Sequence, residues 1–253
     1  MTAWPSMAPA AAAAPRGQML RAQTRAELTL LLRNGEQVLL TLVIPLGLLL
    51  VLTTLDFISV PGRRVDFFVP GVLALSVMST AFTGQAIGTG FERQYGVLKR
   101  LGATPLPRSV LLLAKTLAVL AVEALQVVLV SALGFALGWS PSGNVAGLVL
   151  LLVLGTASFS GLGLLLGGTL RGLTTLAAAN LLWFVLLILG GVLFPLTEFG
   201  SFADVLRWLP TAALSDGLRS LLVGGHLVWR DVAALAAWSV VSLAAAARLF
   251  RWE

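Results

Sequence analysis

Long apolar stretches separated by short polar segments dominate the pattern along the chain. Each of six stretches, read as a helix, is long enough to cross roughly 30 Å of hydrocarbon. They predict membrane spans at residues 37–55, 67–90, 110–139, 145–170, 173–194 and 232–249. Only the uncharged turn 140–144 separates the third span from the fourth, so we expect a tight helical hairpin there. An even number of spans places both chain ends on one side of the membrane.

The segment after the second span has apolar and charged positions at helical spacing. Its apolar side chains, from Phe91 to Leu101, would share about a third of the helix circumference. Gly102 favours a helix end, and Pro105 and Pro107 cannot continue the helix. The pattern predicts an amphipathic helix along the membrane surface at about residues 91–103.

The amino-terminal region divides into two parts. Residues 1–16 are rich in Ala and Pro and predict a disordered tail, not a cleavable signal peptide. Residues 17–36 have leucines on one helical side and arginines on the other, which predicts a helix in the inner membrane interface. The same arginines also suit a positive flank that directs insertion of the first span.

The segment before the last span is too apolar for a solvated loop and too broken for a span. Pro195, Pro210 and Gly224-Gly225 interrupt it, which predicts short re-entrant helices in the outer leaflet at about residues 195–226. Asp216 and Arg219 stand three residues apart and can pair on one helical face. The simpler reading of that pair is an ordinary surface ion pair.

Composition places the whole chain in the membrane class. Hydrophobic residues make up 58% of it and charged residues 11%, against about 25% charged in a soluble domain. Without cysteine there is no disulfide framework and no thiolate metal site. The net charge of +6 comes from scattered basic residues without an aromatic stacking surface, so no nucleic-acid partner is expected.

The basic residues also set the predicted orientation. With the amino terminus in the cytoplasm, twelve of the seventeen Lys and Arg residues fall on the inner side and five on the outer side. This asymmetry is the one that cytoplasmic loops show. We therefore predict a multi-pass protein of a bacterial-type cytoplasmic (inner) membrane, with both termini and the segment 91–103 in the cytoplasm.

Polar residues inside the predicted spans are candidates for a translocation path. A carboxylate such as Glu123 is costly in hydrocarbon unless it is neutral, paired or facing water, although a hydrogen bond between helices explains it equally well. The candidates are Ser79, Thr83, Glu123, Gln126 and Asn180. Two Gly-x-x-x-Gly pairs, at 84–88 and 163–167, allow close helix approach. His226 stands alone, so no metal site is expected.

Two segments resemble the signatures of type-2 ABC exporter permeases, the family of the daunorubicin and multidrug-resistance permeases. The first contains Glu92-Arg93, Gly96, Leu98, Leu101, Thr104-Pro105 and Lys115. The second contains Gly191, Phe194-Pro195, Leu209-Pro210, Asp216 and Arg219. The resemblance extends over the whole six-span chain.

This resemblance implies that a separate subunit binds ATP and that two segments of this chain serve for coupling and gating. The cytoplasmic helix would be a coupling helix that docks on a separate ATPase, with coupling residues Glu92, Arg93, Tyr95, Gly96, Leu98, Lys99, Arg100, Thr104 and Pro105. An outer gate would contain Phe194, Pro195, Pro210, Asp216 and Arg219. The implied partners are two ABC ATPase subunits, which bind ATP and Mg, membrane lipid, and a second permease copy as homodimer or heterodimer.

Together these features predict an all-α integral membrane protein with a six-span permease domain at 37–253. The chain has no G-x-x-x-x-G-K-[ST] phosphate loop, so we expect no cofactor in it and no enzymatic activity of its own. The predicted function is ATP-driven export of amphipathic or lipophilic compounds, drug or lipid-like, by alternating access. Export of a lipid-linked glycan and ion-coupled secondary transport, which needs buried ionisable groups such as Glu123, remain open alternatives.

Overall fold

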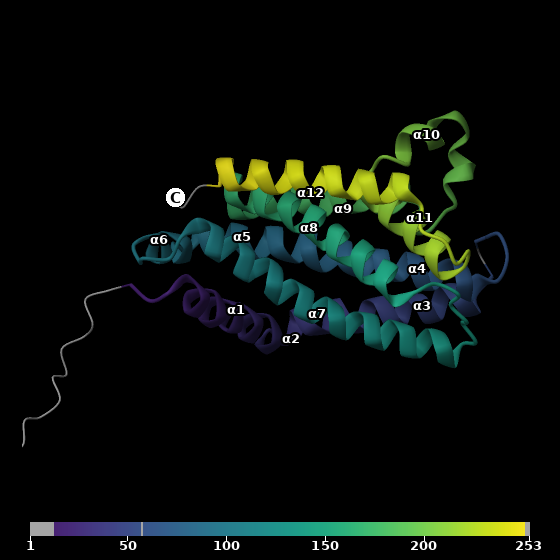
Figure 1. Ribbon diagram of the computed structural model, residues 1–253, viewed down its shortest axis with the longest axis horizontal. Coiled ribbons are helices and arrows are strands. Elements are labelled where there is room, and N and C mark those ends of the chain that lie inside the picture. The colour runs from purple at the N-terminus through teal and green to yellow at the C-terminus, as the bar shows by residue number, and fades with distance from the viewer. Residues whose placement is uncertain (1–12, 57, 251–253) are drawn as a thin grey trace, which may run out of the picture.

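The computed structural model describes residues 13–56 and 58–250, and throughout these the chain forms helices joined by loops and turns. The predicted disordered tail, 1–16, lies almost entirely outside the described residues. The helices run side by side as one elongated bundle (Figure 1). One end carries α6, the start of α1 and the end of α12; the opposite end carries α10 and α11. We call these the α6 end and the α11 end.

Five helical segments are long and apolar enough to cross a membrane, at 64–94, 108–136, 145–169, 172–189 and 229–249. They correspond to the second to sixth predicted spans. The first predicted span, 37–55, contains a shorter apolar helix at 41–54. Its helical run comprises α2 (Gly35–Val38), the π-helical η1 (Leu39–Val43) and α3 (Ile44–Thr54).

The segment 64–94 is the central helix of the bundle. It comprises α4 (Arg64–Val77), the π-helical η2 (Met78–Gly84) and α5 (Gln85–Gln94), and it is by far the most buried of the five. Around it pack α3, α7 (Arg108–Ala136), α8 (Val145–Thr169), α9 (Gly172–Leu189) and α11 (Pro210–Leu222). The last helix, α12 (Trp229–Leu249), packs against α8.

Close contact between α8 and the central helix depends on two glycines. A Cβ atom at Gly163 would lie 2.7 Å from the carbonyl oxygen of Phe82, and one at Gly167 would lie 2.5 Å from that of Ala86. The second Gly-x-x-x-Gly pair therefore mediates a close helix approach, as predicted. The first pair does not do so at Gly88, because a Cβ there would have nothing within 4 Å.

The predicted single helix at 91–103 is divided. Residues 91–94 are the last turn of α5, and a six-residue helix, α6 (Val97–Gly102), follows. The break falls at Gly96, whose φ of 71° is a left-handed conformation that glycine adopts without steric cost. Leu98 of α6 is fully buried against Leu111 and Leu164, so the short helix is packed onto the bundle.

Helices also occupy the two flanking segments. α1 (Arg16–Arg33) forms within the predicted interfacial region and lies against α7. Between α9 and α12 the chain forms η3 (Leu196–Phe202), α10 (Ala203–Leu206) and α11, with Pro210 as the first residue of α11. The location of these segments at the membrane interface and in the outer leaflet stays a prediction.

Candidate functional site

The most concentrated charge inside the bundle lies near the α6 end and joins three helices. Lys115 of α7 is 5% exposed, and its Nζ lies 2.9 Å from Oε2 of Glu27 in α1. Both carboxylate oxygens of Glu92, at the end of α5, lie 2.8 Å from the same nitrogen. We call Glu27, Glu92 and Lys115 the Lys115 cluster. It ties α1 and the last turn before Gly96 to one point on α7.

Some of the predicted coupling residues face the bundle and not the surface. Glu92 points inward to Lys115, and Arg93 donates to the carbonyl oxygens of Gly168 and Leu170 at 3.2 and 3.3 Å. Leu98 is buried. Of the predicted coupling residues, those with exposed side chains are Tyr95, Lys99, Arg100, Thr104 and Pro105. The predicted set therefore divides into residues that attach this end to the bundle and residues that present a surface.

Hydrogen bonds fix the shape of that exposed surface. The Thr104 hydroxyl donates to the carbonyl oxygen of Leu101 at 2.6 Å and accepts from the backbone N–H of Leu106 at 3.4 Å. With Gly96 at one end of α6 and Pro105 beyond the other, the backbone forms a short protruding elbow. The elbow comprises residues 95–105, and Lys99 and Arg100 give it positive charge.

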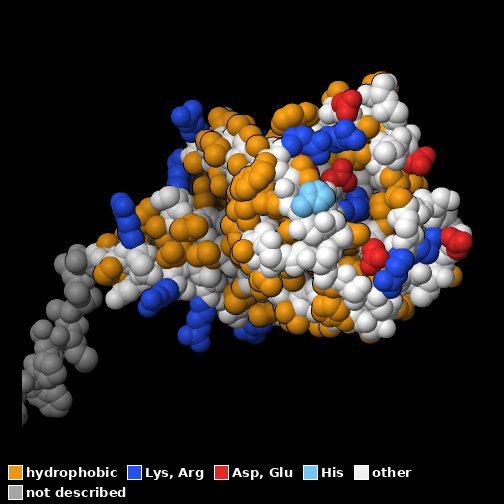
Figure 2. All heavy atoms as spheres, turned by 45° about the vertical axis from the view of Figure 1, so that its right-hand side comes forward, with side chains coloured by type: hydrophobic (Ala, Val, Ile, Leu, Met, Phe, Trp, Pro, Cys, Tyr) orange, Lys and Arg blue, Asp and Glu red, His pale blue; other side chains and the backbone are white. Residues whose placement is uncertain are grey.

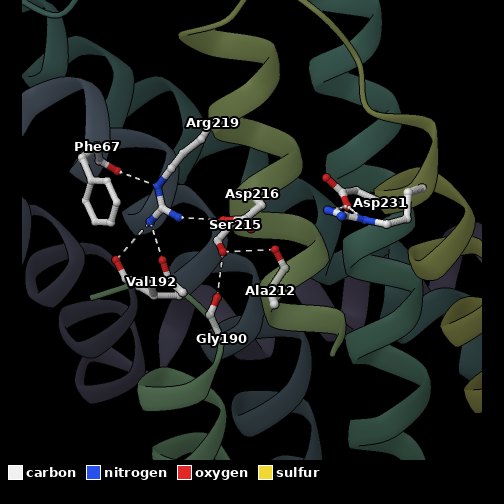
Figure 3. A network of polar contacts seen from close by, with 10 residues as sticks. Phe67, Gly190, Val192, Ala212, Ser215, Asp216, Arg219 and Asp231 are labelled. Atoms are coloured by element: carbon white, nitrogen blue, oxygen red, sulfur yellow. Dashed lines mark hydrogen bonds and ion pairs between the residues drawn. The ribbon is translucent and has the colours of Figure 1, made fainter. Parts of the chain in front are cut away.

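At the α11 end lies a second buried cation, Arg219, which pairs with another predicted outer-gate residue, Asp216 (Figure 3). Arg219 has a 14% exposed side chain and donates to Asp216 Oδ1 at 3.1 Å. It also donates to the carbonyl oxygens of Phe67 at 3.2 Å, Gly191 at 2.5 Å and Val192 at 3.3 Å. Its guanidinium carbon lies 3.8 Å from the centroid of the Phe67 ring.

The Asp216–Arg219 pair is therefore more than an ordinary surface ion pair. Burial lowers the pKa of Arg219 to about 10, against the opposing effect of Asp216, and burial also raises the pKa of Asp216. In both groups burial opposes the ionised form and the opposite charge of the partner favours it. The pair fixes α11 to α4 and to the loop after α9, which leads into Phe194 and Pro195.

Acidic and basic side chains gather on the surface of the α11 end, and an apolar belt lies beside them (Figure 2). Asp231 in α12 is 1% exposed and accepts from the Nε and Nη2 of Arg230 at 2.9 and 2.7 Å. Arg207 donates to Asp204 at 2.9 Å. Among the described residues, no group of three or more His, Cys, Asp or Glu is placed to hold a metal ion.

The candidate pathway residues are not gathered at one place. Glu123 accepts a hydrogen bond from the Thr156 hydroxyl of α8, while Gln126 Nε2 donates to the Thr41 carbonyl oxygen at 2.7 Å and to Thr80 Oγ1 at 3.1 Å. Ser79 accepts from the indole N–H of Trp183 at 3.0 Å. Glu123, Gln126 and Ser79 thus make contacts between helices.

The other two pathway candidates have different surroundings. The Thr83 hydroxyl is buried without a hydrogen-bond partner, and Asn180 is exposed on the apolar face of α9. Sequence reasoning missed Glu27 altogether. Glu27 is the one acidic residue in α1, and that was the signal by which it could have been found.

Comparison with known proteins identifies a family whose match covers both ends of the bundle. The model of the ABC-2 family transporter proteins matches residues 53–248, which includes the elbow, the Lys115 cluster's Glu92 and Lys115, and the Arg219 network. The chain belongs to the ABC-2 transporter family. The permease is also 24% identical over 234 residues to the Bacillus subtilis (strain 168) protein YvfS, whose name describes a transport permease. That alignment covers 88% of the permease and 93% of YvfS.

Membership in the ABC-2 family confirms the resemblance to type-2 ABC permeases. The permease is therefore a membrane subunit for transport. Family membership also implies an ABC ATPase as partner. The five long apolar helices agree with a multi-pass membrane protein.

Proposed function

We propose that the permease is the membrane subunit of an ATP-driven exporter, which moves amphipathic or lipophilic compounds from the cytoplasm or inner leaflet outward by alternating access. Two ABC ATPase subunits bind ATP and Mg and drive the cycle from the α6 end. In this proposal the α6 end and both termini are cytoplasmic, and the membrane is a bacterial inner membrane. The α11 end, with the Arg219 network, forms the outer gate.

The observation that carries the proposal is the elbow at residues 95–105. Its exposed side chains include two adjacent cations, Lys99 and Arg100, while Leu98 is buried in the bundle. A force applied to the elbow is transmitted directly to the central helix, because residues 91–94 are continuous with α5. Through Glu92 and Lys115 the same displacement reaches α7 and α1.

Charge reversal on the elbow tests this proposal. We expect Lys99→Glu combined with Arg100→Glu to weaken co-purification of the partner ATPase at least tenfold and to abolish substrate-stimulated ATP hydrolysis in lipid nanodiscs. Exposed Arg248, at the end of α12, provides the control Arg248→Glu, which should leave both readouts unchanged. Full coupling in the double variant, with normal expression, would refute the docking assignment.

A second permease copy belongs to the same proposal, and α9 is the helix that supports it. α9 is the least covered of the five long helices, with Leu181, Phe184 and Val185 exposed. Asn180 interrupts this apolar face, and a polar side chain is better accommodated between helices than against lipid. Because the chain has no cysteine, Asn180→Cys places a single thiol on this face.

We expect Asn180→Cys to form an oxidant-dependent covalent dimer in membranes, visible as a shift on non-reducing gels. Val128→Cys, on an exposed face of α7, is the matched control and should stay monomeric under the same oxidation. Equal crosslinking at both positions would point to random collision and count against α9 as the dimer face.

A further inference from the structure

A groove lies at the α6 end of the bundle, between the end of α5 and the start of α9. Its volume is about 680 Å³, within the range of about 300–1,000 Å³ that ligand sites occupy. The described residues that line it are Gly90, Arg93, Gln94, Arg171, Leu173 and Thr174. This lining contains two cations and no Asp or Glu, so its charge favours an anionic ligand.

The turn between α8 and α9 holds the two arginines at one place. Arg93 Nη1 donates to the carbonyl oxygens of Gly168 at 3.2 Å and Leu170 at 3.3 Å. Leu170 directly precedes Arg171, so these bonds attach the end of α5 to the residues beside the second arginine. Two like charges at one site repel each other, and an anion between them removes that cost.

Arg171 is the arginine that is available to a ligand. Its side chain is exposed, and its guanidinium makes no hydrogen bond or ion pair with another described residue. A guanidinium is a planar fork of donors that matches two oxygens of one phosphate group. The hydroxyl of Thr174, also exposed in the lining, supplies a further donor. These groups together suit a phosphate group.

The position of the groove along α9 indicates where that phosphate comes from. Arg171 immediately precedes α9, an apolar helix long enough to cross a membrane. The groove therefore lies where the hydrocarbon ends and lipid head groups begin. Leu173, in the same lining, is 70% exposed and offers apolar surface to the first carbons of an acyl chain. A basic pocket between spans at this height is typical of a site for an anionic lipid head group.

We propose that this groove binds the phosphate group of an anionic phospholipid. The Arg171 guanidinium and the Thr174 hydroxyl donate to the phosphate oxygens, Arg93 adds positive charge from a fixed position, and an acyl chain lies against Leu173. The lipid is a bound component and not the transported compound, so the inference does not rest on the proposed function. The site adjoins the proposed dimer face without covering Asn180, which lies about two helical turns further along α9.

Native mass spectrometry of the purified permease, released from detergent micelles, tests the proposal. The probes are dioleoyl phosphatidylglycerol and dioleoyl phosphatidylcholine, which have the same acyl chains and differ in net charge. We expect phosphatidylglycerol to bind about tenfold more tightly, since the choline cation opposes binding beside two arginines. Phosphatidylglycerol should also raise the thermal unfolding midpoint, because a ligand that binds the folded state stabilises it.

Two positions in the groove separate binding from folding. Arg171→Gln should lower the affinity for phosphatidylglycerol about tenfold and leave the midpoint of the lipid-free permease unchanged, since Arg171 has no partner to lose. Arg248→Gln makes the same change at an exposed position of the α6 end and should alter neither readout. Thr174→Trp fills the groove and should prevent binding, whereas Thr174→Ser keeps the hydroxyl and should retain it.

Three results would overturn the proposal. Equal binding of the two lipids, or an equal loss in Arg248→Gln and Arg171→Gln, would mean that lipid adheres by unspecific charge. Displacement of phosphatidylglycerol by inorganic phosphate would mean that the groove takes a soluble phosphate and not a lipid. Unchanged lipid affinity in Arg171→Gln would remove the site, and weaker co-purification of the ATPase in the same variant would assign Arg171 to an acidic side chain of that subunit.

Discussion

A buried basic side chain lies at each end of the bundle, Lys115 at the α6 end and Arg219 at the α11 end, and the two are stabilised in different ways. Lys115 is paired with carboxylates from two other helices, Glu27 and Glu92. Arg219 has one carboxylate partner, Asp216, and directs its remaining donors to three backbone carbonyl groups. The ammonium of lysine is a point charge, whereas the guanidinium of arginine is a planar fork of donors.

The different partners of Lys115 and Arg219 suit different structural roles. A cluster that consists of side-chain charges connects helices through contacts that depend on charge and little on backbone shape. A network that consists of backbone carbonyls sets the path of the chain itself, here the loop after α9. We therefore expect the Lys115 cluster to respond to charge and the Arg219 network to respond to donor geometry.

The largest expected effect follows from Lys115→Met. This change leaves Glu27 and Glu92 buried side by side without a counter-charge, and breaking a buried pair in this way costs about 3–5 kcal/mol. Thermal unfolding of the detergent-solubilised permease should show a large drop in midpoint. Adding Glu27→Gln and Glu92→Gln to the same chain should recover most of the loss, since no uncompensated charge then remains.

The control for this prediction is the double variant Glu27→Gln and Glu92→Gln, in which Lys115 is retained. It leaves a buried ammonium with neutral acceptors and should also be destabilised. Stability that is insensitive to Lys115→Met would show that the carboxylates are already neutral, and the role of charge in this cluster would be disproved.

The next effect is expected from Arg219→Lys. The charge is retained, but the fork that reaches Phe67, Gly191 and Val192 is lost, and buried carbonyl groups become unpaired. One unpaired buried group costs about 1–3 kcal/mol, and since the lysine ammonium can still donate to part of this set, we expect a loss of that order. Hydrogen exchange should rise in the loop after α9, while the exchange of α5 and α7 stays unchanged. A stability equal to that of the unmodified permease would refute the geometric account.

Sequence periodicity predicted the long helices well, because their apolar stretches are long and their ends carry strong signals. The third and fourth spans and their turn appear as α7, α8 and an uncharged connection, with Asn144 capping α8 through the backbone N–H of Gly147. The helix at 91–103 was predicted less well. Helical spacing continues through Gly96, but its left-handed backbone divides the segment, and a periodic pattern carries no information on φ.

The sites were harder to predict than the helices, since they depend on which helix faces which. Lys115 was visible as a charge in a predicted span, but its partners are 88 and 23 residues away in the sequence. The two Gly-x-x-x-Gly pairs show the same limit. They look alike in the sequence, yet Gly163 is in contact with a neighbouring backbone and Gly88 faces open space. Only the tertiary arrangement separates them.

The smallest effect is expected from Asp216→Asn. Asparagine keeps an acceptor oxygen for Arg219 and loses only the negative charge, and the Asp216 side chain is 28% exposed, so water already screens part of the attraction. Since three carbonyl groups also accept from Arg219, we expect a loss of at most about 1 kcal/mol, clearly below that of Arg219→Lys. Asp216→Leu removes the acceptor as well and should cost more than Asp216→Asn. Thermal unfolding midpoints of Asp216→Asn, Asp216→Leu and Arg219→Lys, measured together in one detergent, rank how much each change destabilises the permease. If Asp216→Asn were as damaging as Arg219→Lys, charge and not donor geometry would stabilise the α11 end, and the contrast with the Lys115 cluster would disappear.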